Sequence, residues 1–227
     1  MQKTTDLMRN GPILAEEGKA AANTVAKTHF DYLGGIYNAI SLKTAASRCF
    51  GDHPVLETNL NLNMFNALYY PKTNELYFGD AFQTHADVIA HEYMHAIINC
   101  TAKLVYMNEP GALNEALSDV VAAYFDFVRN GKTANTYLVA ENYVPGVEAM
   151  RFMFDPARDS KSRPSSDYYP DRLLGDDDYG WVHKNSGIIN LAFYLAAEWS
   201  KHPRCNTHIT LTGIGIEKAF DVLFESA

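Results

Sequence analysis

The spacing of apolar residues changes along the chain from helical to extended and back to helical. Residues 13–42 begin alanine-rich and continue with apolar positions at helical spacing, which predicts a helix. In residues 55–64, leucine and methionine alternate with asparagine, which predicts a half-buried strand. An extended stretch at 66–70, a turn at 71–74 and a returning strand at 75–80 then predict an antiparallel meander.

Helical spacing returns near residue 85 and dominates the rest of the chain. The apolar positions predict helices over about 85–100 and 112–129, a third from about 185 and a fourth from 215 or 216. Residues 155–181 are polar and aperiodic, and loops this long are usually functional or mobile. Because strands come first and helices after, the order predicts an α+β fold.

Composition narrows the class of protein. The chain has 227 residues, 47% hydrophobic and 20% charged, enough to bury about 70% of its unfolded surface in a core. Its net charge of −8, with no cluster of lysine and arginine, argues against nucleic acid or an anionic membrane as partner. The three cysteines, at 49, 100 and 205, lack metal-knuckle spacing and allow one disulfide within the chain.

An HExxH motif, HEYMH at 91–95, lies inside a predicted helix. His91 and His95 are four residues apart, so both imidazoles project from one face of the helix. At that separation both rings can reach one zinc ion, at about 2.0–2.1 Å. Glu92 lies beside His91, where a carboxylate can reach a metal-bound water without being a ligand. The alternative is two ordinary histidines on a helix, each satisfied by a hydrogen bond.

The next predicted helix supplies carboxylates in NEALSD at 114–119. Glu115 and Asp119 are four residues apart and share a helix face. One of them can ligate a metal while the other accepts the N–H of a ligating histidine. In isolation two such carboxylates are usually a solvated surface, but the preceding HExxH favours the metal interpretation.

Three blocks, HEYMH, GALNEALSD and GWVHKNSGIINLAFYL, occur in this order along the chain. Their order and spacing resemble the thermolysin family of zinc endopeptidases, over roughly two thirds of the chain from about Asn66 to about Phe220. The resemblance implies a thermolysin-like zincin, with a small antiparallel sheet followed by a mainly helical half and the active site between them. It divides the chain into a subdomain of residues 1–100, which ends in the HExxH helix, and a mainly helical subdomain of residues 101–227.

The resemblance also implies a zinc-dependent metalloendopeptidase that acts on a peptide or protein substrate. One catalytic zinc would be held by His91, His95 and Glu115, with Glu92 as general base towards a zinc-activated water. The remaining roles are implied by matching positions: Asp119 as partner of His91, His183 and Tyr106 as oxyanion donors, and Asp178 as the acid that orients His183. Without the family pattern, His183 would be a surface or capping residue and Tyr106 a core residue.

Substrate contacts follow from the same resemblance. Asn66 and Ala67 match the pair that hydrogen-bonds the substrate backbone, and Arg151 matches the arginine that holds a carbonyl after the scissile bond. Val88 and Met150 match positions lining the pocket on that primed side, which implies a preference for a bulky apolar residue there. Taken alone, Arg151 would be a surface ion pair and Asn66 a turn residue.

Calcium is a weaker implication of the resemblance. Asp87 and Asp126 match two carboxylate ligands of the family, and Glu141 is a candidate third, beside a length change near Tyr143. The next acidic positions of the family fall near Thr136 and Leu138, which cannot hold a second ion. Since calcium prefers about 6–8 oxygen ligands, we expect at most one calcium.

The chain departs from the family at both ends. The family's N-terminal β-rich segment is largely absent, and the sequence ends at AFDVLFESA, as expected for a compact or truncated member. The resemblance implies a secreted protein whose signal and propeptide lie outside this sequence, with a cytoplasmic protein as the alternative. Two other functions compete: a catalytically silent relative that binds a peptide or partner, and a structural zinc domain, although structural sites are usually cysteine-rich and four-coordinate.

Overall fold

The computed structural model describes residues 21–41, 43–44, 49, 56–159, 162–198, 201–204 and 212–225. Its helices are α1 (Thr24–Ile40), α3 (Ala86–Cys100), α4 (Asn108–Asn130), α5 (Asp178–Ala197) and α6 (Ile216–Glu225). Its strands are β1 (Glu57–Leu62), β2 (Ala67–Tyr70), β3 (Glu75–Gly79), β4 (Leu138–Val139) and β5 (Arg151–Phe152). Short 3₁₀ helices, η2 (Pro156–Arg158) and η3 (Tyr169–Asp171), interrupt the long polar loop. The expected α+β fold is confirmed.

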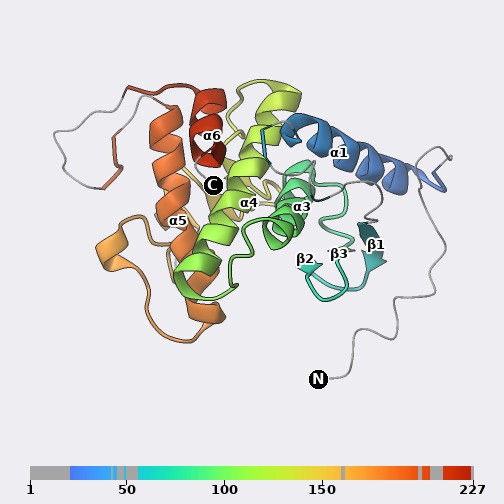
Figure 1. The fold of residues 1–227 in the computed structure, drawn as a ribbon, viewed down its shortest axis with the longest axis horizontal. Helices are drawn as coiled ribbons and strands as arrows, with labels where there is room; N and C mark the ends of the chain where they lie inside the picture. Colours follow the sequence, from blue (N-terminus) through green and yellow to red (C-terminus); the bar gives the residue numbers. More distant parts are fainter. Residues whose placement is uncertain are drawn as a thin grey trace.

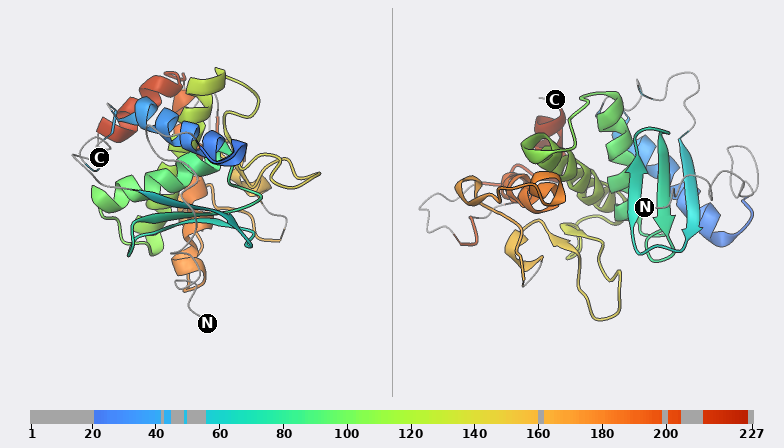
Figure 2. Two further views of the ribbon diagram at one scale, coloured as in Figure 1. Left: turned by 90° about the vertical axis from the view of Figure 1, so that its right-hand side faces the viewer. Right: turned by 90° about the horizontal axis from the view of Figure 1, so that it is seen from below.

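The helix α3 lies in the middle of the molecule (Figure 1). The three-stranded sheet and α1 lie on one side of it, and α4, α5 and α6 on the other (Figures 1 and 2). The α3 face towards the sheet and the face towards α4 are both buried, including Ile89, Ile97 and Ile98. Eleven of its fifteen residues are buried, so this helix holds its side chains in fixed positions, as a site at its surface requires.

The expected antiparallel meander is wrong in its pairing. The strand order is β1-β3-β2, with β1 parallel and β2 antiparallel to β3. The chain crosses the end of β3 between β1 and β2, so close to Gly79 that a Cβ there would lie 1.8 Å from the Met64 carbonyl oxygen. Alternation along a strand predicts which face is buried, but the strand partner depends on this crossing. All five residues of β3 are buried, while β2 is left at the edge of the sheet.

The predicted N-terminal helix is present as α1, but it begins at Thr24 rather than before it. Residues 13–20 and 42 of the prediction lie outside the described part of the chain. Asn23 begins the helix by accepting a hydrogen bond from the Ala26 N–H, 2.9 Å long. Its buried face, which includes Ile36 and Ile40, packs in the same core as the sheet and α3. A disulfide between Cys49 and Cys100, with Cα atoms 5.8 Å apart, ties the end of α3 to the segment before β1.

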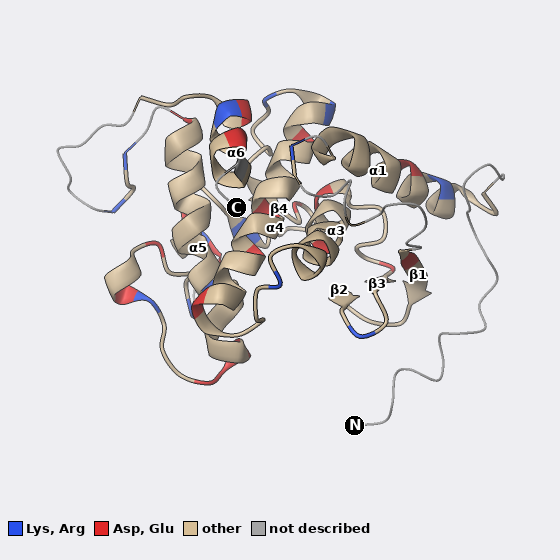
Figure 3. Cartoon of the chain, viewed as in Figure 1, with Lys and Arg blue, Asp and Glu red and all other residues tan. Residues whose placement is uncertain are grey.

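The helical half differs from the prediction mainly at the start of α5. Residues assigned to the polar loop form its first turn, where Asp178, Tyr179, Gly180 and Trp181 all have positive φ. The β4–β5 pair, not predicted from the sequence, brings Arg151 towards α4. Among the described helices, none is both long and apolar enough for a membrane span. Acidic and basic residues are interspersed over the ribbon (Figure 3).

Candidate active site

His91, Glu92 and His95 occupy the face of α3 that is turned towards α4. The imidazoles of His91 and His95 lie nearly perpendicular, with ring centroids 4.6 Å apart and their Nε2 atoms 3.0 Å apart. Glu92 is 7% exposed and close enough to raise the pKa of Tyr106 electrostatically. All three side chains of the motif therefore face one buried space.

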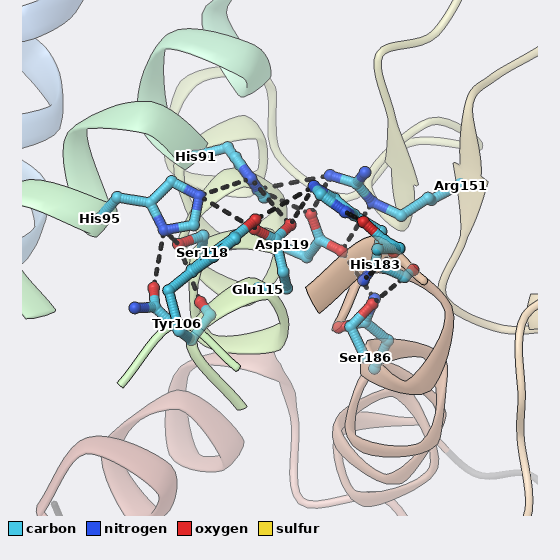
Figure 4. Close-up of polar contacts among 12 residues, drawn as sticks. His91, His95, Tyr106, Glu115, Ser118, Asp119, Arg151, His183 and Ser186 are labelled. Atoms are coloured by element: carbon cyan, nitrogen blue, oxygen red, sulfur yellow. Dashed lines mark hydrogen bonds and ion pairs between the residues drawn. The ribbon is translucent and has the colours of Figure 1, made fainter. Parts of the chain in front are cut away.

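The carboxylates predicted on the next helix complete this space. Glu115 on α4 is buried, and its two oxygens lie 3.4 Å from His91 Nε2 and 3.4 Å from His95 Nε2. One ligand atom from each of the three residues can be chosen so that all lie within 4.8 Å of one another. Figure 4 shows the two helices presenting these groups to each other.

The outer nitrogens of both imidazoles are hydrogen-bonded. His91 Nδ1 lies 2.8 Å from Asp119 Oδ1, and His95 Nδ1 lies 2.7 Å from Asn114 Oδ1 and 3.1 Å from Ser118 Oγ. Donation through Nδ1 leaves the Nε2 lone pair of a neutral ring free to point at a metal. Asn114 and Ser118 lie on the same face of α4 as Glu115 and Asp119, and the sequence reasoning missed them.

One buried polar atom in the described structure has no hydrogen-bond partner at this point. Glu115 Oε2 is buried without a hydrogen-bond donor and lies 3.4 Å from His91 Nε2. The His91 and His95 Nε2 atoms, 3.0 Å apart, cannot both donate to each other. Buried polar groups are normally satisfied, and a cation between them would satisfy all three. Two imidazoles and one carboxylate are the donor set of an open zinc site rather than a closed structural one.

Burial and charge work against each other in this cluster. Burial tends to lower the pKa of His91, but the adjacent carboxylates of Asp119 and Glu115 raise it to about 10. Burial lowers the pKa of His95 outright. Burial tends to raise the pKa of Glu115, yet the nearby His183, His95 and His91 hold it well below its ordinary value. The cluster thus keeps Glu115 as a carboxylate, the form that binds cations.

Asp119 is a buried acid that accepts several hydrogen bonds. Arg151 reaches it from β5 with two hydrogen bonds, of 2.8 and 2.6 Å, and Asn190 on α5 donates a third, 2.7 Å long. Burial tends to raise the pKa of Asp119, but the Arg151 charge and the bond from His91 lower it to about 2. Arg151 Nη2 also lies 3.4 Å from His91 Nδ1. The arginine predicted to hold substrate is therefore fixed by Asp119.

A second chain of polar groups borders the cluster on the side of α5. The Tyr106 hydroxyl donates to Glu115 Oε1 and lies 3.2 Å from His183 Nε2. Asp178 accepts from His183 twice, at 2.7 Å from Nδ1 and 3.1 Å from the backbone N–H. Burial tends to lower the pKa of His183, but the Glu115 charge and the Asp178 hydrogen bond raise it. The imidazole is thus held with Nε2 facing the metal-ligand cluster.

The residues predicted to bind substrate lie at β2, on α3 and beside β5. Ala67 begins β2, the edge strand, and Asn66 precedes it with an exposed side chain. Val88 is buried on α3, and Met150 is half-buried immediately before β5. An edge strand leaves backbone N–H and C=O groups free to pair with an extended peptide.

The candidate calcium residues are less well gathered. Asp87, Asp126 and Glu141 line one pocket beside Arg129. Burial raises the pKa of Asp87, and burial and the Asp87 charge raise the pKa of Glu141 to about 7. Among the described residues, only His91, His95 and Glu115 come close enough together to form a three-ligand metal cluster. Calcium at Asp87, Asp126 and Glu141 stays a prediction.

Comparison with known proteins places this geometry in a family. Residues 102–227 match the model of the thermolysin metallopeptidase α-helical domain. The chain belongs to the thermolysin metallopeptidase family. It is 38% identical over 147 residues to a bacillolysin from Bacillus caldolyticus and 37% identical over 147 residues to a thermolysin from Alicyclobacillus acidocaldarius subsp. acidocaldarius. Each alignment covers 64% of this chain and 25% of the relative, so the chain spans about a quarter of these thermolysin-family relatives.

The fold is likewise that of a thermolysin-family member. The structure is similar to the precursor of protealysin, a metalloproteinase from Serratia proteamaculans, with a TM-score of 0.70 and 27% identity. The likeness covers 80% of this chain and 62% of that protein. The family implies zinc, and the unpartnered Glu115 Oε2, close to His91 and His95, fits such an ion.

Proposed function

We propose that this chain is a zinc-dependent endopeptidase, with His91, His95 and Glu115 holding the metal. The observation that carries the proposal is the buried cluster of the His91 and His95 imidazoles with Glu115, one of whose oxygens has no hydrogen-bond partner. The division into residues 1–100 and 101–227 belongs to the same proposal, because α3 supplies two ligands and α4 the third. Bound zinc would polarise the scissile carbonyl and lower the pKa of water.

The chain's own residues have separate tasks in this proposal. Glu92 accepts a proton from the attacking water and returns it to the leaving amine. Tyr106 and His183 donate hydrogen bonds to the oxyanion that develops on the scissile carbonyl. Asp178 holds the His183 ring in place, since it binds both Nδ1 and the backbone N–H. Asp119 fixes the orientation of the His91 ring.

Substrate lies along the edge strand in this proposal. Asn66 and Ala67 bond to the peptide backbone, and Arg151 holds a carbonyl after the scissile bond. The disulfide between Cys49 and Cys100 supports a secreted protein, because disulfides persist mainly in oxidising compartments.

We expect one zinc per chain and cleavage of an unstructured protein such as casein. Chelation should abolish cleavage, and added zinc should restore it, because the proposed reaction needs the ion that His91, His95 and Glu115 would hold. Metal analysis after chelation and zinc supplementation gives the stoichiometry. A value near zero contradicts the zinc site, and zinc binding without any cleavage identifies a silent peptide- or partner-binding relative.

We also expect selection for the residue after the scissile bond. Val88 and Met150 are apolar and would line that pocket, so a larger apolar side chain buries more surface, worth about 25 cal/mol per Å². Phe or Leu at this position should exceed Ala by roughly 10- to 200-fold in kcat/KM. A peptide library read by mass spectrometry measures this. Strong selection before the bond with indifference after it would contradict the proposed orientation of the cleft.

A further inference from the structure

The first turn of α5 has an unusual backbone. Four consecutive residues, Asp178 to Trp181, have φ of 48°, 54°, 86° and 62°. This left-handed region is rare for residues with a side chain, and rarest for bulky ones. Two of the four are nevertheless aromatic, Tyr179 and Trp181. Strained conformations of this kind cluster at functional sites.

Close packing holds this turn against the beginning of α4. A Cβ on Gly180 would lie 2.1 Å from Asn108 Oδ1, and a Cβ on Gly111 would lie 2.5 Å from Val182 Cγ1 and 3.1 Å from the Tyr106 carbonyl carbon. The turn therefore fits directly onto the segment that carries Tyr106. Its position relative to the candidate oxyanion donors is fixed.

Tyr179 projects from this turn beside the site. Its side chain ring meets the Tyr106 ring edge-on, with centroids 5.7 Å apart, and the residue is 61% exposed. Most of the Tyr179 surface is thus open to a ligand, although one edge is held by a residue of the site. An exposed aromatic ring held on a rigid turn can bury an apolar side chain.

The contacts of Tyr106 indicate which part of a peptide would meet Tyr179. The Tyr106 ring lies against His95, with centroids 6.0 Å apart, whereas Arg151 contacts His91. Figure 4 shows Tyr106 and Arg151 on opposite sides of Glu115. If Arg151 holds the carbonyl after the scissile bond, the Tyr106 side receives the residue before it.

We propose that Tyr179 is a specificity-determining residue that contacts an apolar side chain immediately before the scissile bond. The inference rests on the proposed function, which supplies the direction of the peptide. It adds a second, weaker preference, for the residue before the scissile bond, to the preference expected for the residue after it. The substrate side chain that contacts Tyr179 is expected to be aromatic or large and aliphatic, because the Tyr179 ring is an uncharged aromatic surface.

The test measures binding and cleavage separately. In the Glu92→Gln variant, titrate two alanine hexapeptides that carry Leu at position four and either Phe or Ala at position three. We expect the Phe peptide to bind about 3- to 10-fold more tightly, as an aromatic contact provides. Tyr179→Ala in the same background should remove this difference, whereas Tyr179→Phe should keep it.

Two further variants keep the result interpretable. Tyr179→Asn removes the ring while asparagine adopts a left-handed backbone with less strain, so it replaces the alanine variant if that variant unfolds. Tyr168→Ala removes another exposed tyrosine, which is 47% exposed and lies before α5. This variant should leave the preference unchanged.

The outcomes separate the two proposals. Binding with the Tyr179-dependent preference, but no cleavage by the unsubstituted chain, overturns the proposed function and supports only the contact of Tyr179 with an apolar side chain of a bound peptide. Cleavage with a preference that survives loss of Tyr179 overturns this inference alone. Failure of both peptides to bind the zinc-loaded Glu92→Gln variant overturns it as well.

Discussion

Replacing Glu92 with glutamine is expected to lower kcat by about 10²- to 10⁴-fold, the contribution of a positioned general base. Glutamine has nearly the same shape and fills the same buried place on α3, where Glu92 is 7% exposed. It cannot accept the proton of an attacking water. Because the proposed metal ligands are His91, His95 and Glu115, zinc should remain bound at one per chain. KM should change far less than kcat.

Steady-state kinetics on a mapped peptide, with metal analysis of the same preparation, checks this expectation. Glu148→Gln is the matched control, since Glu148 is an exposed carboxylate paired with Arg158 at 2.7 Å. It should leave kcat within about twofold of the unsubstituted chain, as surface changes generally do. Near-normal turnover by Glu92→Gln would show that another group accepts the proton.

The metal-ligand cluster could be predicted from the sequence because helical geometry decides most of it. A spacing of four residues places His91 with His95 and Glu115 with Asp119 on single helix faces. The helices themselves followed from apolar periodicity. Spacing could not show that the two faces meet, since that depends on how α3 packs on α4. The order of motifs shared with the family supplied this step.

The supporting polar network could be predicted only in part. Asp119 was assigned beside His91 by resemblance, but Asn114 and Ser118 on His95, and Asn190 on Asp119, were missed. Asparagine and serine are common on helices, so their residue type alone carries little signal. Asn114 and Ser118 do share the α4 face of Glu115 and Asp119, and that spacing could have indicated them. Asn190 comes from another helix, and no local pattern connects it with Asp119.

The sheet shows a different limit. Alternating residues correctly predicted extended segments, yet β1 pairs with β3 rather than with β2. The two arrangements bury the same residues, so hydrophobic pattern does not distinguish them. The absence of a side chain on Gly79 permits the crossing. This order leaves β2 at the edge of the sheet, where Tyr69 accepts a hydrogen bond from Asn99 of α3.

Replacing His183 with alanine is expected to lower kcat/KM by about 10²- to 10³-fold, the loss that removal of one oxyanion donor produces. Asp178 holds the imidazole through Nδ1, and Nε2 lies 3.2 Å from the Tyr106 hydroxyl, so the two candidate donors converge. Zinc content should not change, because the proposed ligands are His91, His95 and Glu115, and His183 is proposed only as an oxyanion donor. His202→Ala is the control, a histidine whose Nε2 bonds the Asp167 carbonyl oxygen at 3.1 Å.

Because His183 lies beside Tyr106, substituting both residues tests their shared role more directly than the His183 variant alone. Tyr106→Phe should also lower kcat/KM, and groups that act on one developing charge are not additive. The double variant should therefore lose less than the product of the two single losses. A double-mutant cycle in kcat/KM, with zinc measured for each protein, checks this. Fully independent losses would show that His183 and Tyr106 act at different steps, and loss of zinc with His183→Ala would make it a ligand.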